Sequence, residues 1–184
     1  MDNTYITLLR GINVGGKNKV IMSDLKKCLE ELGFSEIVTY IASGNVIFES
    51  DKKPQEIKML IEKLIPEKFK IDEELIKVLV LSRDQFQVII DHKPEGFGDQ
   101  PEKYHSDAIF LMDKSSDQVM HVFDPREGVD KIWPGNGVIY SQRLSALRTK
   151  SRLNKAIGTP EYKFMTIRSW NTVQKLMELL DQRM

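Results

Sequence analysis

Apolar and polar positions follow two different periods along the first 82 residues. Short runs of β-branched, aliphatic and aromatic residues predict strands at 4–10, 37–42, 46–49 and 75–81. Apolar residues recur every three or four positions after Ser23 and after Pro54, which predicts two helices, the second ended by Pro66. Ser43-Gly44-Asn45 predicts a tight turn that pairs the second and third strands as an antiparallel hairpin.

The order strand, helix, strand, strand, helix, strand is typical of the ferredoxin-like unit, in which two helices cover one face of a four-stranded antiparallel sheet. We therefore predict an α+β fold with a ferredoxin-like βαββαβ subdomain over residues 1–82. A second α+β subdomain, of mixed helices and antiparallel strands with basic C-terminal helices, is expected over 83–184 and packed with the first.

The pattern in the second half is less regular. Ser82-Arg83-Asp84-Gln85 predicts a capping box at the start of a helix, and 107–112 predicts a strand. Pro134-Gly135-Asn136-Gly137 predicts a hairpin between strands at 129–133 and 138–142. Two closing helices are expected, one over 146–157 and one that begins near Thr166.

Composition and charge limit the function classes. The chain carries 27 basic and 27 acidic residues, so no overall field attracts nucleic acid or anionic lipid. The single cysteine, Cys28, cannot form an internal disulfide, and the N-terminus lacks the features of a secretion signal, so we expect a cytoplasmic protein. No segment approaches the roughly 20 apolar residues of a membrane span, and no membrane partner is expected.

A glycine-rich loop follows the first predicted strand. Its sequence, residues 11–19, nearly matches the nucleotide-binding P-loop, but Asn18 stands where that loop needs Ser or Thr to hold magnesium. Bare backbone N–H groups beside lysines can still bind an anion. The alternative is that Gly15 and Gly16 only turn the chain and that the lysines are solvated.

A second basic segment runs from Arg143 to Arg168, with seven basic residues and one acid, Glu161. Lys150 and Arg152 supply donors that suit phosphate or carboxylate. Arg168, near the expected start of the last helix, is the first candidate for anion binding. The alternative interpretations are a solvated charged face and a structural Arg168, paired with a carboxylate or stacked on Trp170.

Three segments, LLRGINVGGKNKV, TYIASGNVIF and TIRSWNTVQKL, carry a family resemblance. In this order and spacing, the chain resembles the mainly bacterial family designated domain of unknown function 1697. The resemblance implies an α+β fold with a ferredoxin-like first part and brings no reaction, substrate or cofactor. The sequence departs from the family pattern at Ile21, Ala42 and Ser169, and the last two positions lack amide side chains that are common there.

Other chemistry is not indicated. His92, His105 and His121 have no zinc-ligand spacing, Cys28 lies on an apolar helical stripe, and no catalytic residue can be named. No metal or cofactor is expected. The basic-Gly-aromatic pattern of RNA-recognition strands is missing, which makes sequence-specific RNA binding by the sheet improbable.

The leading hypothesis is a binding protein for a phosphorylated small molecule, a nucleotide or a nucleic-acid backbone, held in a cleft that both basic segments form. The alternatives are an enzyme acting on an anionic substrate and a protein–protein interaction module. The candidate ligand-binding residues are Arg10, Asn13, Gly15, Gly16, Lys17, Ser43, Asn45, Lys150, Arg152 and Arg168.

Overall fold

The computed structural model describes residues 3–71 and 76–183, which form two compact units. The first unit contains Met1–Phe86 together with Leu180–Met184, and the second contains Gln87–Leu179. This division lies four residues beyond the boundary expected after residue 82, and it assigns the end of the last helix to the first unit.

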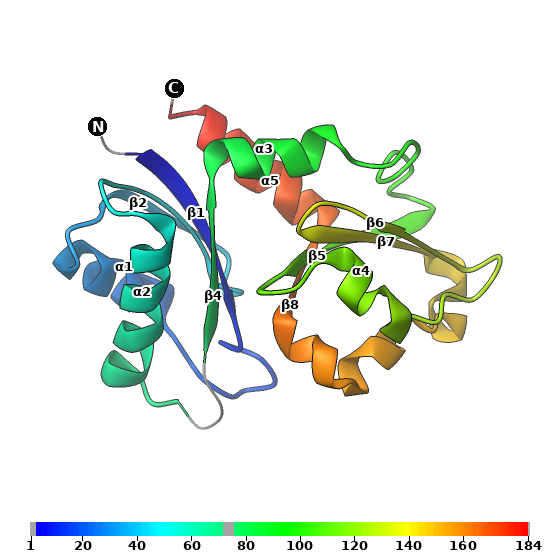
Figure 1. Ribbon diagram of the computed structural model, residues 1–184, viewed down its shortest axis with the longest axis horizontal. Helices are drawn as coiled ribbons and strands as arrows, with labels where there is room; N and C mark the ends of the chain where they lie inside the picture. The colour runs from blue at the N-terminus through cyan, green and yellow to red at the C-terminus, as the bar shows by residue number, and fades with distance from the viewer. Residues whose placement is uncertain (1–2, 72–75, 184) are drawn as a thin grey trace. The chain divides into compact units, whose positions relative to one another are not determined.

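The first unit is a mixed α+β structure (Figure 1). Its elements are β1 (Asn3–Arg10), α1 (Met22–Glu31), β2 (Ser35–Tyr40), β3 (Asn45–Ser50), α2 (Pro54–Lys68) and β4 (Lys77–Ser82). The four strands form an antiparallel sheet in the order β2-β3-β1-β4. Alternation along β1 places Tyr5 and Leu9 on the face that α1 and α2 cover, where they share a buried cluster with Phe48.

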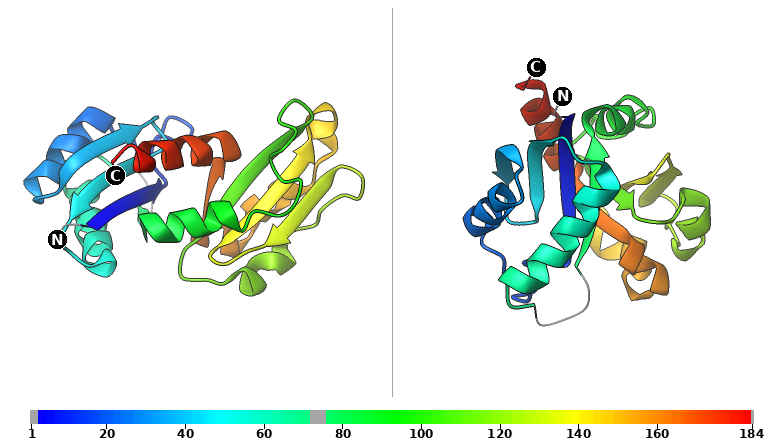
Figure 2. Two further views of the ribbon diagram at one scale, coloured as in Figure 1. Left: turned by 90° about the horizontal axis from the view of Figure 1, so that it is seen from above. Right: turned by 60° about the vertical axis from the view of Figure 1, so that its left-hand side comes forward.

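The second unit contains α3 from residue 87 onward, the four strands of one sheet, the short helix α4 and most of α5 (Figures 1 and 2). Its elements are α3 (Arg83–Asp91), β5 (Tyr104–Leu111), α4 (Ser116–Val119), β6 (Asp130–Pro134), β7 (Val138–Leu144), β8 (Met165–Ser169) and α5 (Trp170–Asp181). The strands form an antiparallel sheet in the order β6-β7-β5-β8. In both units the order across the sheet is therefore second, third, first and fourth strand.

One face of the second sheet is covered by short helical turns. Three 3-10 segments join β7 to β8: η2 (Ser145–Lys150), η3 (Leu153–Gly158) and η4 (Pro160–Phe164). Ile109, Ile139 and Met165 on this face form a buried cluster, against which Phe123 and Tyr162 pack. The opposite face carries an aromatic cluster in which Phe97 contacts Trp133, Tyr140 and Trp170 edge to face.

Several predicted elements are confirmed. The hairpins β2–β3 and β6–β7 form as expected, and Ser82 and Gln85 make the reciprocal hydrogen bonds of the capping box before α3. The start of the strand expected at 75–81 falls partly outside the described residues, and the described strand β4 spans Lys77–Ser82.

Two helix predictions are wrong. The segment 146–157 forms 3-10 turns because the backbone N–H of Arg152 donates to the Asp130 carboxylate, which interrupts the helical hydrogen-bond ladder. The last helix begins at Trp170 and not near Thr166, because Met165–Ser169 pairs with β5 as an edge strand. A third boundary also differs, since α2 continues through Pro66 to Lys68.

Among the described residues, no helix has the length and apolar character that crossing a membrane requires.

Candidate functional site

Asparagine side chains hold the glycine-rich loop of the first unit in place. The amide Nδ2 of Asn13 donates to the carbonyl oxygens of Val20, at 2.9 Å, and Ala42, at 2.8 Å, while its Oδ1 accepts the Val20 N–H. The Asn18 amide donates to the Gly11 carbonyl over 2.8 Å. The fold thus brings the loop and the β2–β3 turn together, and Asn13 supplies a hydrogen bond between them.

Within this loop, Gly15 and Gly16 are the central residues of a tight turn. Both have positive φ, at 58° and 77°, and Lys17 N–H donates back to the Val14 carbonyl over 3.0 Å. Positive φ at both central positions is the requirement of a type I′ turn, which glycine meets without strain. Lys17 is exposed at this turn, whereas Arg10 is the last residue of β1.

Ser43 and Asn45 belong to the same turn region. Asn45 is fully buried, and its amide donates to the Tyr40 carbonyl and to the Ser43 hydroxyl, both over 3.0 Å. These contacts shape the turn from within. The ligand-binding role predicted for Ser43 and Asn45 remains a prediction.

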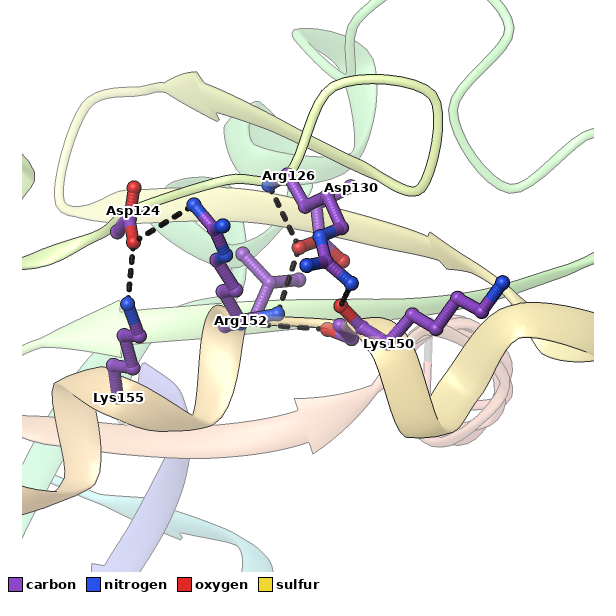
Figure 3. Close-up of polar contacts among 8 residues, drawn as sticks. Asp124, Arg126, Asp130, Lys150, Arg152 and Lys155 are labelled. Atoms are coloured by element: carbon purple, nitrogen blue, oxygen red, sulfur yellow. Dashed lines mark hydrogen bonds and ion pairs between the residues drawn. The ribbon is translucent and has the colours of Figure 1, made fainter.

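Two side chains of the basic segment in the second unit bind an aspartate of the same unit (Figure 3). Lys155 Nζ and Arg152 Nη1 both donate to Asp124 Oδ2, at 2.6 and 3.3 Å. The hydrogen bond from Lys155 lowers the pKa of Asp124 below its ordinary value. Lys150 is exposed, and its carbonyl accepts a hydrogen bond from Arg126 Nη1. This arrangement favours a structural role for Arg152, because its guanidinium already contacts a carboxylate.

Arg168 belongs to the edge strand β8 and not to the first turn of the last helix, which begins at Trp170. It is 7% exposed, pairs across the strands with Ala108, and donates from Nη1 to the Thr166 hydroxyl and the Ile167 carbonyl, both over 2.9 Å. Burial lowers the pKa of Arg168 to about 10, so the side chain stays charged at neutral pH. The structure does not group Arg168 with Lys150 and Arg152. The loop residues belong to the other unit, so the expected joint cleft remains a prediction.

A cavity of about 220 Å³ lies on the face of the second sheet that the 3-10 turns cover. In the register of β5 and β7, His105 is opposite Arg143 and Asp107 is opposite Ser141, so the four side chains share this face. All four line the cavity, together with Asn154 of the 3-10 segment. The other lining residues are apolar or aromatic, among them Ile109, Phe123 and Met165.

Three charged or titratable groups meet at the polar end of this cavity. His105 Nε2 donates to Asp107 Oδ1 over 3.0 Å, and Arg143 Nη2 is 3.9 Å from Asp107 Oδ2. The side chains of Asp107 and Arg143 are only 16% and 14% exposed, whereas that of His105 is 46% exposed and lies nearer solvent. The Nε of Arg143 is buried and has no hydrogen-bond partner among the described residues.

The surroundings of Asp107 change the pKa of its carboxyl group. Burial raises the pKa of the Asp107 carboxyl above its ordinary value, and the attractions of His105 and Arg143 only partly offset that effect. A carboxylate and a guanidinium that are both largely shielded from solvent can together bind a small polar molecule. A more open depression on α2, bordered by Lys53, Met59 and Lys63, has no comparable buried charge.

No group of three or more His, Cys, Asp or Glu side chains in the described part of the chain is placed to hold a metal ion.

Sequence reasoning did not select His105, Asp107 or Arg143. The alternation of side chains along β5 could have identified two of them. His105 and Asp107 lie on the same face of the strand as Ile109 and Leu111, which are buried, because every second residue points to that face. Polar residues on the buried face of a strand are more informative than exposed charge runs. Arg143 was counted only as one member of the basic segment, because the pairing of β5 with β7 could not be read from local sequence.

The raised pKa of Asp107 predicts a pH-dependent stability change for Asp107→Asn. The folded protein holds the Asp107 proton more tightly than the unfolded chain does, so ionisation of Asp107 costs stability as the pH rises through the folded-state pKa. We expect Asp107→Asn to raise the free energy of unfolding at neutral pH, and the gain to shrink as the pH falls through that pKa. Urea unfolding at several pH values measures this difference.

Asp51→Asn is the matched control, since the Asp51 side chain is 76% exposed and its replacement should leave the free energy of unfolding nearly unchanged. A loss of stability in Asp107→Asn at neutral pH would mean that the contacts with His105 and Arg143 outweigh the cost of burial.

Comparisons with known proteins agree with this architecture. A search of curated proteins finds no match. Among solved structures, the chain is similar to a conserved bacterial protein from Streptococcus pneumoniae, with a TM-score of 0.81 and 25% sequence identity over 98% of this chain and 99% of that one. The family model described as protein of unknown function (DUF1697) matches residues 2–140, which include the first two family-like segments and end before TIRSWNTVQKL. The predicted family is therefore confirmed, and the chain belongs to DUF1697.

Proposed function

We propose that this protein is a cytoplasmic binding protein for a small anionic metabolite, and that the acid group of the ligand binds to Arg143 in the cavity of the second unit. The observation that carries the proposal is the Arg143 side chain at the cavity wall, which is only 14% exposed and whose Nη2 lies 3.9 Å from Asp107 Oδ2, beyond hydrogen-bond distance. Burying a charged group is costly unless it is well paired. A carboxylate or phosphate bound to the Arg143 guanidinium would supply a charge-assisted hydrogen bond of the kind that the 3.9 Å separation from Asp107 does not allow.

The size of the cavity supports a small ligand. Its volume is about 220 Å³. This volume is below the range of about 300–1,000 Å³ in which drug-sized ligands are enclosed. The proposal therefore favours a small metabolite over an enclosed nucleotide.

The test is the melting temperature of the protein against a panel of small carboxylates, sugar phosphates and inorganic phosphate. A ligand at about 100 times its dissociation constant adds roughly 2.7 kcal/mol, which shifts the melting temperature by a few degrees. We expect such a shift for one class of anion in the wild-type protein and none in Arg143→Met.

Arg148→Met is the matched control because Arg148 is an exposed arginine of the same basic segment that does not line the cavity. Its melting temperature should respond to the ligand as that of the wild type does. A full shift retained in Arg143→Met would disprove the proposed site, and circular dichroism of that variant shows that it is folded.

The second candidate function is an enzyme that acts on the bound anion. The pair of His105 and Asp107, joined over 3.0 Å, favours it, since a carboxylate that orients an imidazole is a common acid–base arrangement. Consumption of the bound molecule, followed by NMR and stopped by His105→Gln without loss of binding, would support the enzyme. Saturable binding without consumption supports the binding protein.

We also propose that the first unit has the ferredoxin-like fold. The element order β1-α1-β2-β3-α2-β4 and the sheet order β2-β3-β1-β4 support this assignment. Cytoplasmic location is part of the proposal as well, and the single free cysteine, Cys28, is consistent with it.

A further inference from the structure

Asp107 and Arg143 carry opposite charges and lie side by side in the cavity of the second unit, but no hydrogen bond joins them. Arg143 Nη2 and Asp107 Oδ2 are 3.9 Å apart, which is too long for a hydrogen bond. The nearest partner of Asp107 is the His105 imidazole, which occupies Oδ1. A carboxylate can accept several hydrogen bonds, so Oδ2 retains the capacity for another donor.

The energetics of Asp107 indicate that a further cation would stabilise it. Burial raises the pKa of its carboxyl in spite of His105 and Arg143, which means that the existing positive groups do not fully offset the loss of solvent. A ligand ammonium group next to Oδ2 would oppose this effect. The same ligand must still present an acid group to Arg143, as in the proposed function.

An ammonium and a carboxylate on one carbon atom match this spacing. In an α-amino acid the two charged groups are immediate neighbours, as Asp107 and Arg143 are in the cavity wall. A ligand whose charges are separated by a long chain could not contact both residues from one position. A zwitterion also leaves the net charge of the site unchanged, which limits the cost of burying it.

The remainder of the cavity suits an apolar side chain. Ile109, Phe123, Leu153 and Met165 form its wall beyond the charged end, and Ile109 and Met165 are almost completely buried. Contact with such a wall stabilises a bound aliphatic or aromatic group by removing it from water.

We propose that the ligand of this cavity is an α-amino acid with an apolar side chain, with its carboxylate bound by Arg143 and its ammonium by Asp107. This inference rests on the proposed function and specifies its ligand class. The amino acid side chain occupies the wall formed by Ile109, Phe123, Leu153 and Met165.

Isothermal titration calorimetry of the full chain at neutral pH tests this assignment. The probes are valine, leucine, methionine and phenylalanine, each compared with the analogue that lacks the ammonium group, for example 4-methylpentanoate for leucine. We expect at least one amino acid to bind and its analogue without ammonium to bind about tenfold to a hundredfold more weakly, because a hydrogen bond between charged groups is lost.

Two variants assign the groups. In Asp107→Asn the preference for the amino acid that binds over its analogue without ammonium should disappear, whereas in Arg143→Met both should lose binding. Arg148→Met should bind like the wild type, since Arg148 is outside the cavity. The comparison of ligands on the wild-type chain does not depend on whether either variant folds.

The possible outcomes separate this inference from the proposed function. Equal binding of an amino acid and its analogue without ammonium, or binding of phosphates only, overturns the amino acid assignment while an Arg143-dependent anion site stands. Absence of binding by all four amino acids also overturns the assignment. If, in addition, no anion shifts the melting temperature, the proposed function is wrong as well.

Discussion

Replacing Gly98 by alanine is expected to destabilise the second unit by about 2–5 kcal/mol. Gly98 has a φ of +77°, and a Cβ added there would lie 2.5 Å from Cδ1 and 2.8 Å from Nε1 of the Trp170 ring. That ring cannot move away easily, because Trp170 is 3% exposed and packs edge to face on Phe97 and Tyr140. Both the backbone strain and the steric overlap therefore act against the folded state.

Urea unfolding followed by tryptophan fluorescence measures this effect, because Trp133 and Trp170 both belong to the aromatic cluster. Gly96→Ala is the matched control in the same loop. Gly96 has nearly the same φ, +76°, but no atom lies within 4 Å of the added Cβ, so only the cost of positive φ, about 1–2 kcal/mol, should remain. Equal losses in the two variants would show that the Trp170 contact contributes nothing.

Replacing Asn13 by alanine is expected to cost about 2–4 kcal/mol in the first unit. The variant loses three hydrogen bonds: two from the Asn13 amide, to the carbonyls of Val20 and Ala42, and one from the Val20 N–H to Oδ1. It also places alanine at a φ of 53°, which asparagine tolerates better. The β2–β3 turn should then be held less firmly against the glycine-rich loop, because the hydrogen bond from Asn13 to the Ala42 carbonyl is lost.

Hydrogen exchange at the backbone amides of residues 11–20 and 41–46 reports this change. Asn13→Gly separates its two causes, since glycine relieves the positive φ but still lacks the three hydrogen bonds. We expect Asn13→Gly to be less destabilised than Asn13→Ala and still less stable than the wild type. A wild-type level of protection in Asn13→Ala would mean that the Asn13 hydrogen bonds do not hold the loop in place. Asn13 would then be available for the ligand-binding role predicted from the sequence.

The structural role of Asn13 changes how the family-like segments are interpreted. LLRGINVGGKNKV and TYIASGNVIF stand far apart in the chain, yet Asn13 bonds the Ala42 carbonyl and Gly44 lies against Leu9 and Ile12. A Cβ on Gly44, whose φ is +86°, would lie 2.8 Å from the Leu9 Cβ. At least two of the family-like residues are therefore needed for folding: Asn13 for its hydrogen bonds and Gly44 because it has no side chain.

Local sequence was sufficient wherever a structure depends on neighbouring residues. Periodicity predicted α1 and α2, turn chemistry predicted both hairpins, and the pair Ser82 and Gln85 predicted a cap, because each of these depends on contacts within a few residues. The family and the α+β class followed from the same segments.

The sequence failed where distant residues compete for the same backbone groups. Residues 146–157 have a helical pattern, but the carboxylate of Asp130 in β6 accepts a hydrogen bond from the Arg152 N–H. The sequence from Thr166 to Ser169 is compatible with the start of a helix, but these residues pair with β5 as a strand. In both places a long-range hydrogen bond decided the local conformation, as tertiary context commonly does.

The candidate site arises from long-range pairing. Local patterns along the chain are enough to indicate an α+β protein of this family and basic residues that gather in two segments. The pairing of β5 with β7 places His105 opposite Arg143 and Asp107 opposite Ser141, and residues of the 3-10 turns complete much of the cavity lining. The reason is that side-chain proximity across a sheet depends on register between segments some 35 residues apart, which no local pattern specifies.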